Sequence, residues 1–115
     1  MKKKLIILGI GTLLLFSLSS CTEILTCVIT SPNHNEKFSE NEPIYVIVEA
    51  STNKGSVIQV QILVDNEIKK SFTKPPYCDT IRPRYLTKGI HSISAEAYSS
   101  GGNMETDAFY ITIKE

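Results

Sequence analysis

The chain has 115 residues, which is enough for one domain. Its 12 Lys and Arg residues balance its 12 Asp and Glu residues, but three of the cations lie at Lys2, Lys3 and Lys4. Residues 21–115 therefore carry 9 cations against 12 acids, a net charge near −3. Because a phosphate backbone requires a cationic surplus, no nucleic-acid partner is expected. The hydrophobic content of 42% is typical of a globular domain and not of a disordered chain.

The first 20 residues have the layout of a secretory signal peptide. The cationic start at Lys2–Lys4 is followed by an apolar run of 12 residues, 5–16. A membrane span requires about 20 apolar residues, whereas a run of this length is typical of the apolar centre of a signal peptide. We therefore expect residues 1–20 to be a signal peptide that is cleaved on export.

The segment Leu18-Ser19-Ser20-Cys21 resembles the lipobox of bacterial lipoproteins, in which small residues precede a cysteine. The resemblance implies cleavage before Cys21, diacylglycerol on its thiol, and acylation of the new N-terminus, for example with palmitate. Two or three such chains, at ~0.8 kcal/mol for each buried CH₂, hold a small domain on a membrane. The alternative is an ordinary secretory signal with an incidental cysteine.

This resemblance divides the chain into a signal peptide (1–20), a lipidated tether (21–26) and a folded domain (27–115). An Asp directly after the cysteine would resemble an inner-membrane retention signal, but Thr22 stands there. The expected location is therefore the cell envelope, lipid-anchored to the outer membrane. The periplasmic and the surface-exposed face both remain open.

Two further cysteines, Cys27 and Cys78, are available for a disulfide in an exported domain. The bridge would close a loop of about 50 residues, which is worth roughly 4 kcal/mol in the chain-entropy model. The alternative is two free cysteines. No Cys-x-x-Cys pair or Cys/His cluster is present in the sequence, so no metal site and no cofactor are expected.

The remainder of the chain alternates apolar and polar residues with a period of two, separated by turn-forming residues. In 57–64, for example, Ile58, Val60, Ile62 and Val64 share one face. This period predicts strands and no helix. Seven strands are expected, at 27–30, 44–50, 57–64, 67–70, 77–81, 90–98 and 108–114.

Seven short strands in about 94 residues predict an all-β fold, a Greek-key sandwich of two sheets. The segments that carry a family resemblance are Ile29–Pro32, Pro43–Ala50, Ile58–Asn66, Pro76-Tyr77 and Gly89–Ala97. In their order and spacing they resemble the strands and turns of bacterial immunoglobulin-like domains, and the resemblance covers residues 27–114. It also gives Cys78 the opposite parity from Tyr77 and Ile81. Either the strand is shifted there or the disulfide prediction is wrong.

The chain offers little catalytic chemistry. His34 lies in a polar loop, and the family pattern gives His91 an inward, packing and hydrogen-bonding role. No Ser-His-Asp or Cys-His arrangement is readable, so no catalytic residue is expected. Glu36, Glu40 and Glu42 could hold a weak calcium ion, but their spacing matches no ligand loop, and a solvated acidic loop is the simpler interpretation.

A binding patch is the remaining candidate site. Arg82, Arg84 and Tyr85 lie in one connection, together with Lys88 and after Tyr77. An exposed Tyr beside Arg suits stacking on a sugar or anchoring a protein, although cross-strand packing also explains many tyrosines of β-sheets.

These features predict a non-enzymatic binding or adhesion module at the cell envelope, with an envelope protein or a glycan as partner. One alternative is a structural accessory subunit that docks on a larger complex through a sheet edge. Another is an inhibitor of a secreted hydrolase, which ranks last because no inhibitory loop motif is readable.

Overall fold

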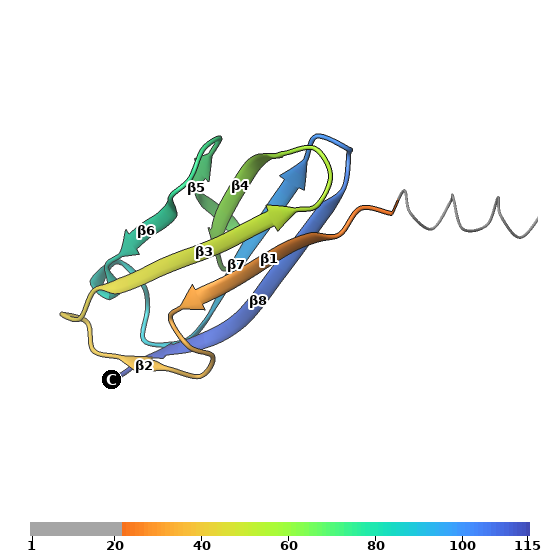
Figure 1. Ribbon diagram of the computed structural model, residues 1–115. Coiled ribbons are helices and arrows are strands. Elements are labelled where there is room, and N and C mark those ends of the chain that lie inside the picture. The colour runs from red at the N-terminus through yellow and green to blue at the C-terminus, as the bar shows by residue number, and fades with distance from the viewer. Residues whose placement is uncertain (1–21) are drawn as a thin grey trace, which may run out of the picture.

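The computed structural model describes residues 22–115, and the predicted signal peptide and Cys21 lie outside this range. Eight strands and one 3₁₀ turn follow one another along the described chain (Figure 1). They are β1 (Leu25–Ser31), β2 (Lys37–Phe38), β3 (Ile44–Thr52), β4 (Val57–Val64), β5 (Glu67–Phe72), β6 (Tyr77–Ile81), η1 (Pro83–Tyr85), β7 (Gly89–Ser99) and β8 (Met104–Ile113). No helix in the described residues is long and apolar enough to cross a membrane.

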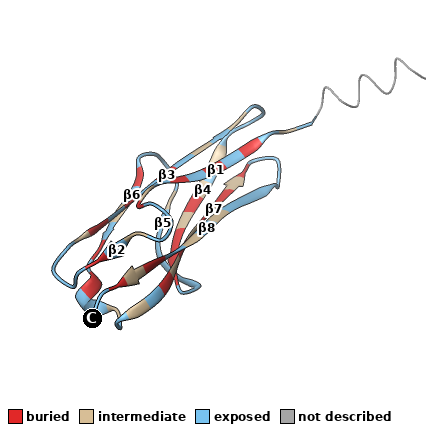
Figure 2. Cartoon of the chain, turned by 90° about the horizontal axis from the view of Figure 1, so that it is seen from below, coloured by how far each residue is buried: buried red, intermediate tan, exposed pale blue. Residues whose placement is uncertain are grey.

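The strands form two sheets that face each other. One sheet has the order β1-β3-β6 and the other the order β2-β8-β7-β4-β5. All neighbours are antiparallel except β2 and β8, which are parallel. Buried residues line the space between the two layers (Figure 2). The predicted all-β two-sheet sandwich is therefore confirmed.

The period-two pattern of the sequence places one side of each strand in the core. In β3, Ile44 and Val46 have no exposed surface, whereas Tyr45 and Ile47 between them are 58% and 43% exposed. Burying a Val or Ile side chain contributes about 1.5–3 kcal/mol. The alternation of β3 therefore fixes which face of the three-stranded sheet packs against the other layer.

The predicted inward face of β4 is correct for Val60, Ile62 and Val64 but wrong for Ile58, which is 49% exposed. The pairing of β4 with β7 shifts between Val57 and Gln59. An irregularity of one residue reverses the side to which the preceding side chains point. The shift therefore turns Ile58 out of the core.

The sequence pattern missed two elements, β2 and η1, and placed the start of β8 too late. β2 has only two residues, and η1 is a single 3₁₀ turn. β8 begins at Met104, earlier than expected, and its first four residues pair with β7 from Ala95 to Tyr98. These four residues are mostly exposed, so they carry no alternating apolar signal.

The strands run between two ends of the sandwich. The N-terminal pole comprises residues 22–24 and the β3–β4 and β7–β8 connections, 53–56 and 100–103. The C-terminal pole comprises residues 32–43, 65–66 and 82–88. The chain enters at the first pole and ends near the second (Figure 1).

Candidate functional site

The predicted patch lies at the C-terminal pole, on the short turn η1. Pro83 begins this turn and is fully buried, so its ring fixes the connection to the body of the domain. The amides of Tyr85 and Leu86 donate to the carbonyls of Arg82 and Pro83 at 3.1 and 2.8 Å. The buried proline and the closed turn direct the neighbouring side chains toward solvent.

Tyr85 is the large hydrophobic residue of the patch, and 76% of its surface is accessible. The Arg84 guanidinium lies 5.3 Å from the centre of its ring, within the range of a cation–π contact. One face of the Tyr85 ring thus contacts Arg84, and most of the side chain remains open to solvent. Such a pair can stack on a planar or sugar surface, or insert into a partner protein.

A small hollow beside the patch is lined by Glu40, Asn41, Pro43 and residues 82–84. Its volume of about 50 Å³ is far below the several hundred Å³ of a typical ligand pocket. Lys88 reaches Glu40 at 3.8 Å and joins the two loops on the surface. The structure therefore brings Arg82, Arg84 and Tyr85 into one open surface, and recognition there would occur by surface contact.

Three other tyrosines do not extend this surface. Tyr77 is buried and packs edge-on against Phe72, with ring centres 6.0 Å apart. Tyr98 is half-buried and its hydroxyl donates to Glu96 at 2.9 Å. Tyr45 is exposed, but it lies on the outer face of β3.

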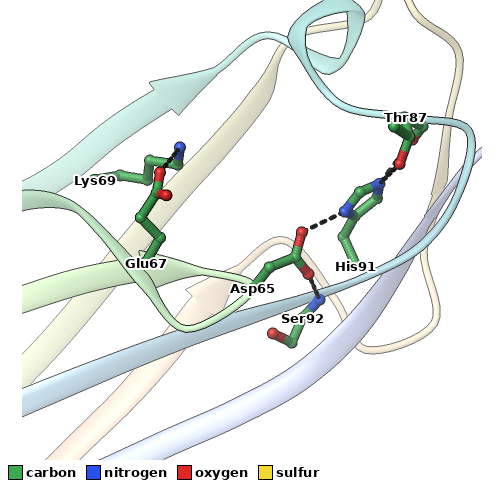
Figure 3. Close-up of polar contacts among 6 residues, drawn as sticks. All are labelled: Asp65, Glu67, Lys69, Thr87, His91 and Ser92. Carbon is green, nitrogen blue, oxygen red and sulfur yellow. Dashed lines mark hydrogen bonds and ion pairs between the residues drawn. The ribbon is translucent and has the colours of Figure 1, made fainter.

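A histidine–carboxylate pair holds the same pole together (Figure 3). Asp65 lies in the tight β4–β5 turn, where it and Asn66 have positive φ angles of 52° and 66°. The Nδ1 atom of His91 is 2.6 Å from the Asp65 carboxylate, and its Nε2 atom is 2.7 Å from the Thr87 carbonyl. The second carboxylate oxygen accepts from the Ser92 amide at 3.0 Å.

Both ring nitrogens of His91 thus face acceptors, and only the protonated ring donates to both. Burial lowers the pKa of His91, but the hydrogen bonds to Asp65 and Thr87 and the Asp65 charge outweigh it, so the pKa is raised. For Asp65, burial raises the pKa, but the hydrogen bonds from His91 and Ser92 together lower it by more. The net pKa of Asp65 is therefore lowered. The packing and hydrogen-bonding role predicted for His91 is confirmed.

The predicted Cys27–Cys78 disulfide is wrong. Both cysteines are free, with Cys27 buried and Cys78 exposed. Cys27 pairs with Ala50 of β3 and points inward, whereas Cys78 pairs with Ile47 on the other side of β3 and points outward. Two thiols on opposite faces of a sheet cannot meet. Burial, and then the negative charge of Asp107, raise the pKa of Cys27 to about 11, which makes the thiol unreactive.

A carboxylate cluster at the N-terminal pole was not predicted. Glu23 accepts hydrogen bonds from the Thr52 hydroxyl, from the Ser99 hydroxyl at 3.0 Å and from the Asn103 side-chain amide at 2.6 Å. These donors, Thr52 and Asn103 first, lower the pKa of Glu23 against a smaller effect of burial. The cluster joins the incoming chain to both connections of the pole. Nothing in the sequence marks it, because Glu23 and its three polar donors lie far apart along the chain.

The three acids considered as calcium ligands, Glu36, Glu40 and Glu42, make hydrogen bonds or an ion pair within the protein. Glu36 accepts from the amide of Asn33 at 2.9 Å, and Glu42 accepts from the amide of Ser39 at 3.0 Å. Each carboxylate therefore closes its own turn, while Glu40 pairs with Lys88. Within residues 22–115, no group of three or more acid, His or Cys side chains has a metal-binding arrangement.

Comparison with known proteins identifies the family. The family model of the bacterial Ig domain matches residues 26–95. The chain belongs to this family. No curated protein matches the chain. Among solved structures, this bacterial Ig domain is similar to the Clostridium thermocellum CbhA fibronectin(III)-like modules, with 28% identity and a TM-score of 0.69.

Two of the similar solved structures are longer than this bacterial Ig domain. The similarity to the CbhA modules covers 81% of this chain and 48% of that chain. The endo-β-1,4-mannanase from Thermotoga petrophila is 13% identical with a TM-score of 0.65, and the match covers 80% of this chain and 20% of that one. The second likeness shows the fold alone. The chain thus spans about half or less of these proteins.

Proposed function

We propose that this bacterial Ig domain is a non-enzymatic binding module, held on the outer membrane by a lipid on Cys21. The observation that carries the proposal is the Arg84–Tyr85 pair, which is exposed on a turn fixed by buried Pro83. Tyr and Arg side chains are enriched among the residues that dominate the binding energy of protein interfaces. The partner is an envelope protein or a glycan.

The matched control for this surface is Tyr45, which is also exposed but lies on β3 at 58% accessibility. The full-length lipoprotein would be crosslinked in intact cells, captured by an affinity tag and tested in parallel on a glycan panel. Tyr85→Ala should weaken capture by at least about tenfold, because an aromatic residue that anchors an interface is worth about 2 kcal/mol or more. Tyr45→Ala should retain it. Equal capture by wild type and Tyr85→Ala would contradict the proposal.

Location is tested separately with protease on intact and lysed cells. Loss of the lipoprotein on intact cells would favour adhesion or glycan capture at the surface. Protection until lysis would favour a periplasmic partner. A mature protein without acyl chains by mass spectrometry would overturn the proposed anchoring.

A second candidate function, an accessory subunit of an envelope complex, is favoured by the outer face of the β1-β3-β6 sheet. Val28, Tyr45 and Ile47 are 49%, 58% and 43% exposed there. Two shallow hollows of about 420 and 390 Å³ lie on either side of Ile47 and Cys78. Ile47→Lys should then abolish a stoichiometric co-purifying partner that Tyr85→Ala retains. The reverse result would favour the C-terminal pole.

A further inference from the structure

The N-terminal pole fixes the chain very close to its start. Glu23 is joined to Thr52, Ser99 and Asn103 by the hydrogen bonds of its carboxylate. The next residue, Ile24, donates its amide to the Asn53 side chain at 2.7 Å, and its carbonyl accepts from the Asn53 amide at 3.3 Å. The chain is therefore attached to the domain from Glu23 onward.

This attachment removes most of the expected tether. Leu25 and Thr26, expected in the tether 21–26, are the first two residues of β1. Only Thr22 separates Glu23 from Cys21 in the sequence. Two residues span at most ~7 Å even when fully extended. A lipid on Cys21 would consequently be held within a few ångströms of the folded domain.

The exposed chemistry of this pole suits a lipid surface. Three large apolar side chains are exposed around it: Ile24 precedes β1, Ile58 is the second residue of β4 and Met104 begins β8, with accessibilities of 62%, 49% and 50%. The two connections are composed mainly of Ser, Gly and Asn. Glu23 keeps its negative charge, because the neutral donors Thr52 and Asn103 lower its pKa, and the same hydrogen bonds hold its carboxylate against the domain. Exposed apolar side chains strengthen binding at the headgroup boundary in proportion to the apolar area that they bury there.

We propose that the N-terminal pole rests directly on the bilayer surface, with Ile24, Ile58 and Met104 at the lipid headgroups. This inference rests on the lipidation of Cys21. With this pole on the bilayer, the strands point away from the membrane. β7 connects the two poles, and its 11 residues at about 3.3 Å each place the C-terminal pole ~35 Å from the N-terminal pole. Tyr85 and Arg84 are thereby presented at the end of the domain that is farthest from the membrane.

The test uses the full-length lipoprotein in vesicles of phosphatidylethanolamine and phosphatidylglycerol that carry a nitroxide on the headgroup. A thiol-reactive fluorophore is placed at Ser56→Cys in the N-terminal pole or at Asn41→Cys in the C-terminal pole. Cys78→Ser removes the exposed native thiol, and Cys27 is not labelled because it is buried with its pKa raised to about 11. Both probes sit on exposed loop residues.

Quenching of the Ser56→Cys probe should exceed that of the Asn41→Cys probe by about tenfold, because nitroxide quenching acts only at short range and ~35 Å separates the poles. Glu23→Ala should lower this ratio, because it loosens the chain before Ile24, which stays joined to Asn53. The matched variant Glu42→Ala, which removes a turn-closing carboxylate of the other pole, should leave the ratio unchanged.

The outcomes separate this inference from the proposed anchoring. Vesicle flotation with equal quenching at both positions would overturn the membrane-resting pole and leave the lipid anchor intact. Failure to float, together with an intact mass that lacks acyl chains, would overturn the anchor and the inference with it. Glu23→Gln, which keeps the size of the side chain, repeats the comparison if Glu23→Ala does not fold. An unchanged ratio in the Glu23 variant that folds would also overturn it.

Discussion

Each pole of the sandwich is organised by one carboxylate, but the donors differ. At the N-terminal pole, Glu23 receives hydrogen bonds from the neutral side chains of Thr52, Ser99 and Asn103. At the C-terminal pole, Asp65 depends on His91, whose ring is also bonded to the Thr87 carbonyl. Neutral donors do not titrate near neutral pH, whereas the imidazole does. The attachment at the chain start is therefore indifferent to moderate pH changes, and the pole that carries Tyr85 is not.

The largest expected effect is a loss of stability from a substitution in the core that both poles share. Ile93 of β7 is fully buried and pairs with Val64 and Phe109. Ile93→Ala should lower the free energy of unfolding by about 3–4 kcal/mol, because it removes buried methyl groups and leaves a cavity. Denaturant unfolding followed by probes at both poles should show one shared transition. Separate transitions at the two poles would show that the poles unfold independently.

The next effect distinguishes the poles by pH. Because the folded pKa of His91 is raised above 6.5, its stabilisation is complete below pH 6.5 and is lost as the pH rises through the folded value. Because the folded pKa of Asp65 is lowered, its contribution is present above pH 3.8 and is lost as the pH falls through the folded value. The pair should therefore stabilise the domain most between pH 3.8 and 6.5.

Thermal or denaturant unfolding across this range measures the effect with His91→Gln. This variant should cost about 1.5–3 kcal/mol between pH 3.8 and 6.5, the range for hydrogen bonds to charged groups, and less at alkaline pH. His34→Gln is the matched control, since His34 is exposed. A pH dependence that persists in His91→Gln and disappears in His34→Gln would contradict the assignment.

A smaller effect examines the N-terminal pole. A Cβ at Gly101 would lie 2.9 Å from the Oε1 atom of Glu23, so Gly101→Ala should displace the carboxylate from its donors and lower the unfolding midpoint. The same substitution should cost less in a Glu23→Ala background, where no carboxylate is displaced. A double-mutant cycle measures this coupling. Additive effects would show that Gly101 does not act through Glu23.

The smallest expected effect concerns Tyr85. Because the side chain is 76% exposed, Tyr85→Ala should change the free energy of unfolding by less than about 0.5 kcal/mol while it weakens binding. Unfolding and capture measured on the same preparation separate the two. A large loss of stability would mean that Tyr85 supports the fold instead of a partner.

The sequence was sufficient to predict the two-sheet sandwich, because a strand that is buried on one side must alternate apolar and polar residues. Ile44, Val46 and Val48 carry this requirement in β3, and Ile93 and Ala95 carry it in β7. The pattern failed at Ile58, because a shift in pairing depends on the neighbouring strand and leaves no mark on the periodicity. The parity of Cys78 against buried Tyr77 did contain the answer about the disulfide, since the two faces of a strand are set by adjacent positions.

The patch was predictable only in part. Arg84 and Tyr85 are adjacent in the sequence, so their contact required no knowledge of the fold. The cluster around Glu23 could not be predicted, because Thr52, Ser99 and Asn103 are brought to it by two separate connections. Polar residues of that kind occur in every loop, and only the three-dimensional fold distinguishes the ones that meet.

The two unpaired thiols make the folding of this domain independent of redox conditions. Because Cys27 is enclosed in the core and Cys78 faces solvent, no oxidant is needed to complete the native structure, and no isomerase is needed to correct it. The domain can be produced in a reducing cytosol in its native form. Of the two cysteines among residues 22–115, only Cys78 is exposed, so air-exposed samples would crosslink there unless a reductant or Cys78→Ser prevents it.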